Sequence, residues 1–329
     1  MSLPSVLQNS LTLPVICSPL FIISNPDLVI AQCKAGVVGS FPALNARPAE
    51  ELDVWLERIT RELAEYKAAN PDAVVAPFAV NQIVHSSNDR LQHDVEMCVK
   101  YKVPIVITSL RAPNEVVGPI HSYGGLVFHD VINVKHAKKA IEAGVDGLIL
   151  VCAGAGGHAG QLSPFALVSE IREFYDGPII LSGSISKGEQ ILAAQAMGAD
   201  LAYMGTRFIA THEANADQAY KQMLVDTSAD DIVYSNLFTG VHGNYLKPSI
   251  QNAGMDPNAL PEGDKSTMKF GSGGSNKSKA WRDIWGAGQG VGSIGAITST
   301  AEAVSKLEKE YASARARMQS IASPYGEQS

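Results

Sequence analysis

The feature that most constrains the fold is a regular alternation of short apolar runs with amphipathic segments, which continues to about residue 212. The apolar runs have the length of β-strands, and the segments between them have the spacing of helices. Strands that are joined by helical crossovers lie parallel in one sheet. The predicted strands are Leu13–Cys17, Val37–Phe41, Val74–Val80, Pro104–Ser109, Leu126–His129, Gly147–Cys152, Pro178–Ser182 and Leu201–Met204.

Helices are predicted between these strands. At 143–144 and 197–198 a glycine directly follows the last apolar residue, which is typical of a helix end. The predicted helices include Ala49–Ala69, Asp89–Lys100, Val134–Ala143, Pro164–Tyr175 and Lys187–Met197.

Eight strands in this alternation favour an α/β fold of the (β/α)8, or TIM-barrel, type. Such a barrel places its active site at the C-terminal ends of the strands. Small, polar or glycine residues follow almost every predicted strand, as a ligand-binding rim requires. An open doubly wound sheet is the competing architecture, but it concentrates binding at one switch point.

The pattern changes after residue 212, so we divide the chain into three parts. Residues 1–212 form the barrel, 213–299 a lid or substrate segment, and 300–329 a C-terminal helix that packs back on the barrel. The tract 270–279 is rich in glycine and serine and predicts a flexible loop. A segment this long and this poor in periodicity is typical of a lid over a site.

Charge and composition exclude several classes of partner. The net charge of −7 argues against nucleic acid or an anionic membrane, since both require a basic face. No apolar run approaches the ~20 residues of a membrane helix, and no signal peptide is evident. The four cysteines lack paired spacing and are expected to be reduced thiols. We therefore expect a cytoplasmic protein; its oligomeric state is left open.

The most informative motif is Ala153–Gly160, with the sequence AGAGGHAG, which directly follows a predicted strand. Its four glycines allow positive φ angles and close approach of the backbone to a ligand. The imidazole of His158 is the side chain best suited to move protons near neutral pH. The eight histidines show no metal-binding spacing, so no metal site is predicted. His129, at the end of a strand, is a weaker candidate for the pocket.

Two stretches match the spacing of a dinucleotide fingerprint. Residues 290–295 read GVGSIG but follow no convincing strand, and residues 154–159 lack a following acid that would hold a ribose. Residues 290–295 are better interpreted as a glycine-rich turn, and a Rossmann site at 154–159 is a minor alternative.

A phosphate site is predicted after the seventh and eighth strands. These strands end in Ser182-Gly183 and Gly205-Thr206, and the corresponding loops of barrels commonly bind phosphate through backbone N–H groups.

The order and spacing of these motifs resemble the nitronate monooxygenase family, formerly called 2-nitropropane dioxygenases. The resemblance rests on Gly154–Gly160, Leu181–Ser184, Tyr203–Phe208 and Trp285–Gly290, and it covers most of the chain. It implies an FMN-dependent barrel that oxidises alkyl nitronates or nitroalkanes with O2. His158 matches the family's catalytic histidine, which acts as a base or stabilises a bound nitronate. The implied FMN contacts are Ser18, Pro19, Leu20, Asn81, Gly156, Gly157, Ser182, Gly183, Ser184, Met204, Gly205, Thr206 and Gln289.

The chain departs from the family pattern at several positions. Ser18–Phe21 replaces the usual Ala-Pro-Met, Gly154 replaces an acid, and a glutamine expected near Val151 is missing. Asp130 stands where a basic or amide residue is common.

Two alternatives stay open. One is an NAD(P)H-dependent FMN reductase of quinones or enoyl thioesters, because such enzymes share these motifs. The other is a barrel that binds a phosphate ligand without catalysis, against which His158 argues.

Overall fold

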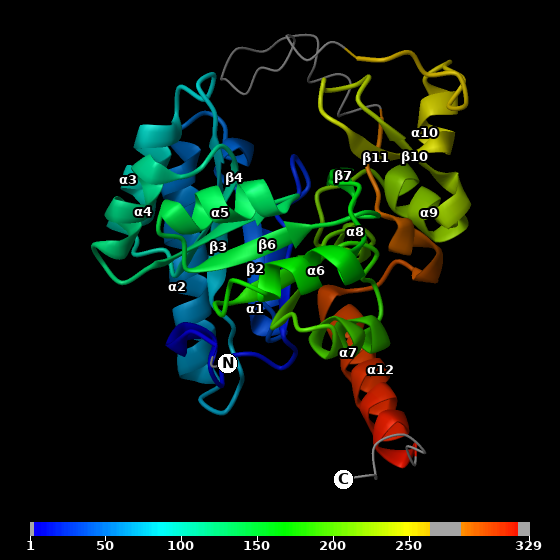
Figure 1. The fold of residues 1–329 in the computed structure, drawn as a ribbon. Helices are drawn as coiled ribbons and strands as arrows, with labels where there is room; N and C mark the ends of the chain where they lie inside the picture. Colours follow the sequence, from blue (N-terminus) through cyan, green and yellow to red (C-terminus); the bar gives the residue numbers. More distant parts are fainter. Residues whose placement is uncertain (1–2, 264–283, 322–329) are drawn as a thin grey trace.

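The computed structural model describes residues 3–263 and 284–321, and its centre is a parallel eight-stranded barrel (Figure 1). The strands follow one another around the sheet in chain order, with β1 and β9 adjacent. Backbone hydrogen bonds join Val38 to Val15 and to Cys17, which brings β1 and β2 together and completes the ring. The strands are β1 (Val15–Cys17), β2 (Gly39–Pro42), β3 (Phe78–Val84), β4 (Ile105–Leu110), β5 (Leu126–Val131), β6 (Gly147–Val151), β8 (Ile179–Ser182) and β9 (Leu201–Met204). The predicted TIM-barrel fold is confirmed.

Helices cover the outside of the barrel (Figure 1). Asparagine side chains begin two of them: Asn25 accepts the N–H of Leu28, and Asn133 accepts the N–H of His136. The barrel helices are α1 (Pro26–Lys34), α2 (Glu51–Ala69), α3 (Leu91–Lys100), α4 (Asn114–His121), α5 (Val134–Glu142), α6 (Pro164–Arg172), α7 (Gly188–Ala196) and α8 (Thr206–Ile209).

Two apolar layers hold the barrel together. One lies between the strands and the helices, and the other fills the barrel interior. Alternate residues of each strand enter each layer, as the period of two in a β-strand requires. Leu7, in the short helix η1 (Ser5–Leu7), joins the interior cluster from the segment before β1. The interior residues are Ile16, Val38, Ala79, Ile105, Ile107, Phe128, Ile149, Ile180, Leu201 and Tyr203.

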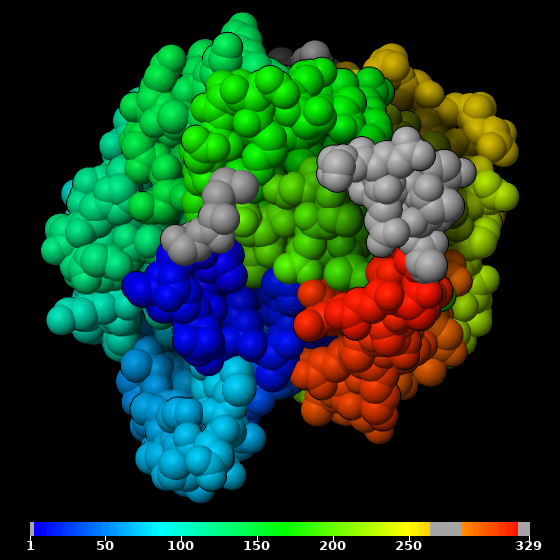
Figure 2. Space-filling view, turned by 60° about the horizontal axis from the view of Figure 1, so that its bottom comes forward, coloured from blue at the N-terminus to red at the C-terminus, as the bar shows by residue number. Residues whose placement is uncertain are grey.

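The long helix α12 (Thr300–Ser320) packs mainly on α7 and also on α1. In Figure 2 this helix is red and lies on the same face as the blue N-terminal part of the chain. Ser299 and Glu302 form a capping box that fixes where α12 begins.

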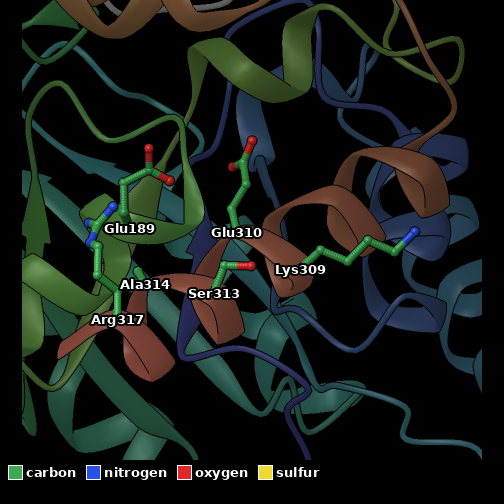
Figure 3. Close-up of a pocket in the computed structure, with 6 residues that line it drawn as sticks. All are labelled: Glu189, Lys309, Glu310, Ser313, Ala314 and Arg317. Carbon is green, nitrogen blue, oxygen red and sulfur yellow. The ribbon is translucent and has the colours of Figure 1, made fainter. Parts of the chain in front are cut away.

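A cavity of 330 Å³ lies between α7 and α12 and is lined by Glu189 and five residues of α12 (Figure 3). None of these residues belongs to the site described below.

The segment after residue 212 has more structure than its poor periodicity predicts. It contains η3 (Ala229–Asp231), η5 (Gln289–Ser293) and the strands β10 (Ile232–Ser235) and β11 (Gly243–Leu246). These strands form a small antiparallel sheet with β7 (Gly157–His158) of the glycine motif, and β11 lies in its middle. The predicted flexible loop at 270–279 lies outside the described residues. No helix among residues 3–263 and 284–321 has the length and hydropathy needed to span a membrane. The remaining elements are α9 (Gln218–Asp226), α10 (Lys247–Asn252) and η2 (Ala43–Asn45).

Candidate active site

Polar side chains replace apolar ones in the barrel interior near the C-terminal ends of the strands. Asn81 of β3, Ser109 of β4 and Asp130 of β5 follow inward-facing apolar residues at intervals of two. They form a hydrogen-bonded row: the Asn81 amide donates to Ser109 Oγ at 2.9 Å, and the Ser109 hydroxyl donates to Asp130 Oδ2 at 2.6 Å. This row gives the barrel a polar floor, which we call the Asn81–Asp130 row.

Two buried atoms of this floor have no hydrogen-bond partner among the described residues. One is Oδ1 of Asp130, and the other is the hydroxyl of Tyr203 on β9. Burial raises the pKa of Asp130 to about 7, although the Ser109 hydroxyl lowers it in part. Burial also raises the pKa of Tyr203, and the charge of Asp130 adds to that rise. Unsatisfied buried polar atoms are rare and indicate a place for a ligand or water.

The glycine motif after β6 folds back as a tight loop. Gly154 has a φ of +83° and Gly157 a φ of +66°, values that glycine adopts without strain. The Asn244 amide donates to the carbonyl of Ala155 at 2.6 Å, and the N–H of Gln289 donates to the carbonyl of Gly154 at 2.9 Å. Segments about 90 and 135 residues further along the chain therefore hold this loop in place.

His158 lies in β7, which pairs with β11 opposite Gly243. Its Nε2 is 2.8 Å from the hydroxyl of Thr239. That hydroxyl donates to the carbonyl of Val241 at 3.0 Å, so it accepts from Nε2 and favours the tautomer with the proton on Nε2. Burial lowers the pKa of His158 to about 4, so its imidazole is neutral at pH 7.

The loops after β8 and β9 meet the C-terminal segment. Gly205 lies close against the end of the first strand, because a Cβ added there would lie 2.9 Å from Ser18 Oγ. The N–H of Gly288 donates to Thr206 Oγ1 at 2.9 Å, and the N–H of Ser184 donates to the carbonyl of Gly154. The glycine loop, the two predicted phosphate loops and the first strand end thus meet in one place.

Other predicted contacts take different positions. Pro19 and Leu20 are half-buried beside this rim, and Gln289 is exposed on it. The side chain of Met204 is fully buried in the outer apolar layer, so it does not face the barrel interior. His129 also points outward, with Nδ1 2.8 Å from Thr108 Oγ1, and burial lowers its pKa to about 4. His129 does not line the site.

Sequence reasoning missed three residues of the site. Thr239 and Asn244 lie in the segment of poor periodicity, and no local pattern links them to the glycine motif. Tyr203 had a usable signal, because it follows the interior residue Leu201 by two positions in the same strand.

The part of the chain that the structure describes contains no set of side chains that could bind a metal ion. No group of three or more His, Cys, Asp or Glu side chains there has the geometry to hold an ion.

A second cavity, of 410 Å³, opens beside the rim, next to the segment that follows Leu20. It is lined by Phe21, Ile22, Asn25, Leu44, Asn45, Arg47, Trp55 and Asn215.

The family model described as nitronate monooxygenase matches residues 6–310. A nitronate monooxygenase of Paraburkholderia phytofirmans is 26% identical, over 90% of this chain and 92% of that protein. A (3aS,4S,5R,7aS)-5-hydroxy-7a-methyl-1-oxo-octahydro-1H-indene-4-carboxyl-CoA dehydrogenase of Rhodococcus jostii is 24% identical, over 73% of this chain and 64% of that protein.

The fold also resembles solved structures. The structure of FabK from Thermotoga maritima has a TM-score of 0.73 and 22% identity, covering 94% of this chain and 96% of that one. At this identity the similarity shows the fold alone.

Proposed function

The chain belongs to the nitronate monooxygenase family of oxidoreductases, and on that premise we propose that it is an FMN-dependent nitronate monooxygenase. The observation that carries the proposal is the position of His158. Thr239 holds this neutral imidazole at the end of the glycine loop, and Gly154 of the same loop accepts a hydrogen bond from the loop that follows β8. A barrel that only bound a phosphate ligand would need no such group there.

The residues present fit FMN. The loops 182–186 and 205–206 contain three serines, a threonine and two glycines and no carboxylate. A phosphate monoester needs such hydroxyl and N–H donors. On the barrel floor, the unpartnered atoms of Asp130 and Tyr203 match the heteroatoms of a polar ring system. FMN bound there would take electrons from the substrate and pass them to O2.

We assign the proton transfer to His158. In the tautomer that Thr239 favours, Nδ1 carries the basic lone pair and accepts the α-proton of a nitroalkane. The low pKa means that the resting imidazole is uncharged. Its single N–H is donated to Thr239, so it can donate a hydrogen bond to a nitronate only after Nδ1 has taken up the proton. An anion that forms beside the ring favours its protonated form, which assists the transfer.

In this proposal the three predicted parts of the chain keep separate tasks. Residues 1–212 hold FMN, residues 213–299 cover the substrate, and residues 300–329 pack on the barrel. The pairing of Gly243 with His158 supports the second assignment, because it sets the covering segment directly against the imidazole. The partners are a small nitronate or nitroalkane and O2.

The experiment is a product assay on the protein loaded with FMN. We expect ethyl nitronate and O2 to be consumed together with release of nitrite. No nitrite from several small nitronates, in a protein that holds FMN, would overturn the proposal.

A second candidate is an NAD(P)H-dependent FMN reductase of quinones or thioesters. The similarity to a carboxyl-CoA dehydrogenase favours it. The cavity on the rim supports it too. Arg47, which lies over the Phe21 ring, offers a positive charge, and Trp55 offers an aromatic surface, and the phosphates and rings of NAD(P)H could use both. Oxidation of NADH with a quinone or enoyl thioester, without activity on nitronates, would establish it.

A further inference from the structure

The cavity of 410 Å³ beside the rim lies outside the site around His158. Its lining residues include no implied FMN contact, and neither His158 nor Thr239 is among them. Four lining side chains are apolar or aromatic: Phe21, Ile22, Leu44 and Trp55. The others are three asparagines and Arg47, so no acidic side chain of the described residues lines the cavity. Apolar and aromatic walls with one charged group are typical of a small-molecule site.

Arg47 brings to this cavity a positive charge that no carboxylate of the described residues neutralises. Its Nε donates to the carbonyl of Leu44 at 2.8 Å, and the guanidinium lies over the Phe21 ring, 5.4 Å from its centroid. In the same part of the chain, Nη1 and Nη2 have no hydrogen-bond or ion-pair partner. Burial and the nearby charge of Arg90 both lower the pKa of Arg47. A bound anion would offset that repulsion between two cations.

The arginines on the neighbouring elements are already paired. Arg90 contacts Asp94 at 3.0 Å, and Arg58 contacts Asp27 at 2.5 Å. Arg90 also donates to the carbonyl of the residue before Arg47, so it holds the backbone there. Both acids therefore have a cation of their own, and Arg47 keeps two N–H groups for a ligand.

Ile22 forms a wall of the cavity in a backbone conformation that β-branched residues rarely adopt. Its φ is +67°, and its side chain is 40% exposed. The N–H of Ile22 donates to Asn45 Oδ1 at 2.9 Å, and its carbonyl accepts from Asn215 Nδ2 at 3.0 Å. Two lining asparagines thus hold the strained residue from both sides. Strain of this kind persists where the surroundings enforce it, and it is concentrated at ligand sites.

We propose that this cavity binds a planar aromatic ring that carries an anionic group, a carboxylate or a phosphate, in addition to FMN. The anionic group lies on Nη1 and Nη2 of Arg47, because a planar guanidinium matches two oxygens of such a group. The ring packs against Trp55 and the exposed side chain of Ile22. The inference goes beyond the proposed function, since it concerns a second site whose residues take no part in the chemistry at His158.

The test is a calorimetric titration of the protein, with FMN present, using 2-naphthoate as the probe. We expect one equivalent to bind and the visible absorption of FMN to stay unchanged. 2-Naphthylmethanol keeps the ring without the charge and should bind at least about tenfold more weakly. Cyclohexanecarboxylate keeps the charge without the aromatic ring and should bind about fivefold more weakly.

Two variants locate the probe. Arg47→Met should raise the Kd for 2-naphthoate at least about tenfold, because it removes a hydrogen-bonded charge. Trp55→Leu should raise it about fivefold through the lost aromatic contact, and it keeps the test valid if Arg47→Met does not fold. Arg61→Met is the matched control, because Arg61 is half-exposed on α2, pairs with Glu57 and does not line the cavity. Its Kd should equal that of the natural protein.

The two sources of such a ligand are a free aryl carboxylate and the nucleotide part of NAD(P)H. Displacement of 2-naphthoate by NADH would support the assignment and identify the dinucleotide as the source. Binding of 2-naphthoate that NADH does not disturb would support it with a free aryl carboxylate as the source.

Three results would overturn the inference: no binding of 2-naphthoate, an unchanged Kd in Arg47→Met, or release or perturbation of FMN by the probe. These failures are distinct from failure of the proposed function. Nitrite release without naphthoate binding refutes only the second site, whereas naphthoate binding without nitrite release refutes only the nitronate activity.

Discussion

His158 Nε2 and Thr239 Oγ1 lie 2.8 Å apart although 81 residues separate them in the sequence. The hydroxyl also bonds to Val241, so it orients the imidazole and favours the tautomer with the proton on Nε2. Thr239→Val keeps the shape of the side chain and removes this hydroxyl. We expect kcat/KM for nitroalkanes to fall about fivefold with FMN binding unchanged, since one orienting hydrogen bond contributes ~1 kcal/mol. Thr227→Val, which affects only a bond within α9 and its end, is the control.

His158→Asn removes the proton acceptor and keeps a polar side chain of smaller size. Turnover of nitroalkanes should fall by about 10²-fold or more, the usual effect of losing an acid–base group, while the protein still holds FMN. In the double variant with Thr239→Val, no further loss is expected, because both changes act through the same imidazole. Steady-state kinetics check both, and full activity of His158→Asn would remove His158 from the mechanism.

The pH dependence of nitroalkane turnover follows from the low pKa of His158. A base must be deprotonated to act. The part of the kcat/KM profile that reports the protonation of His158 should therefore stay flat as the pH falls to about 5. It should fall as the pH drops through about 4. A limb near pH 6.5 that disappears in His158→Asn would show an ordinary imidazole, contrary to the burial seen here.

Asp130 should also affect stability. Its pKa is raised in the folded protein, to about 7, so the folded state binds more protons than the unfolded state between about pH 4 and 7. The contribution of Asp130 to stability therefore decreases as the pH rises through this window. Asp130→Asn should raise Tm more at pH 8 than at pH 4.5. Thermal unfolding at the two pH values checks the sign, and a larger gain at pH 4.5 would contradict it.

Gly154 tests the packing of the glycine loop. A Cβ at this position would lie 2.1 Å from Ser184 Oγ, and the residue has a φ of +83°. Gly154→Ala should therefore weaken FMN binding at least tenfold by displacing Ser184. Gly254→Ala is the matched control, because Gly254 has a φ of +80° and nothing lies within 4 Å of its added Cβ. Equal FMN affinity in both variants would show that the loop does not support the cofactor.

The sequence predicts the barrel well because its signal is local. All eight strands are present, but β3 begins at Phe78 and runs to Val84 instead of spanning 74–80. Pro77 lacks an N–H for the ladder, which explains the later start. The polar Asn81 and Gln82 looked like a strand end, yet they pair with Ile107 and Thr108. Polarity does not end a strand whose inner face forms the floor of a site.

The rest of the site depends on contacts that no local pattern records. The strand β7 has two residues, and it exists because Gly157 and His158 pair with Asn244 and Gly243 far along the chain. Thr239 is equally distant. The place of His129 in the outer layer, in contrast, follows from local alternation, because it directly follows Phe128, an interior residue of the same strand.

An anaerobic titration of the FMN-loaded protein, with ethyl nitronate in one cuvette and NADH in another, tests the central claim most directly. We predict that nitronate bleaches the visible absorption of the bound flavin, that O2 restores it, and that NADH leaves it unchanged over the same time. Bleaching by NADH with no response to nitronate would contradict the account, as would a protein that does not retain FMN.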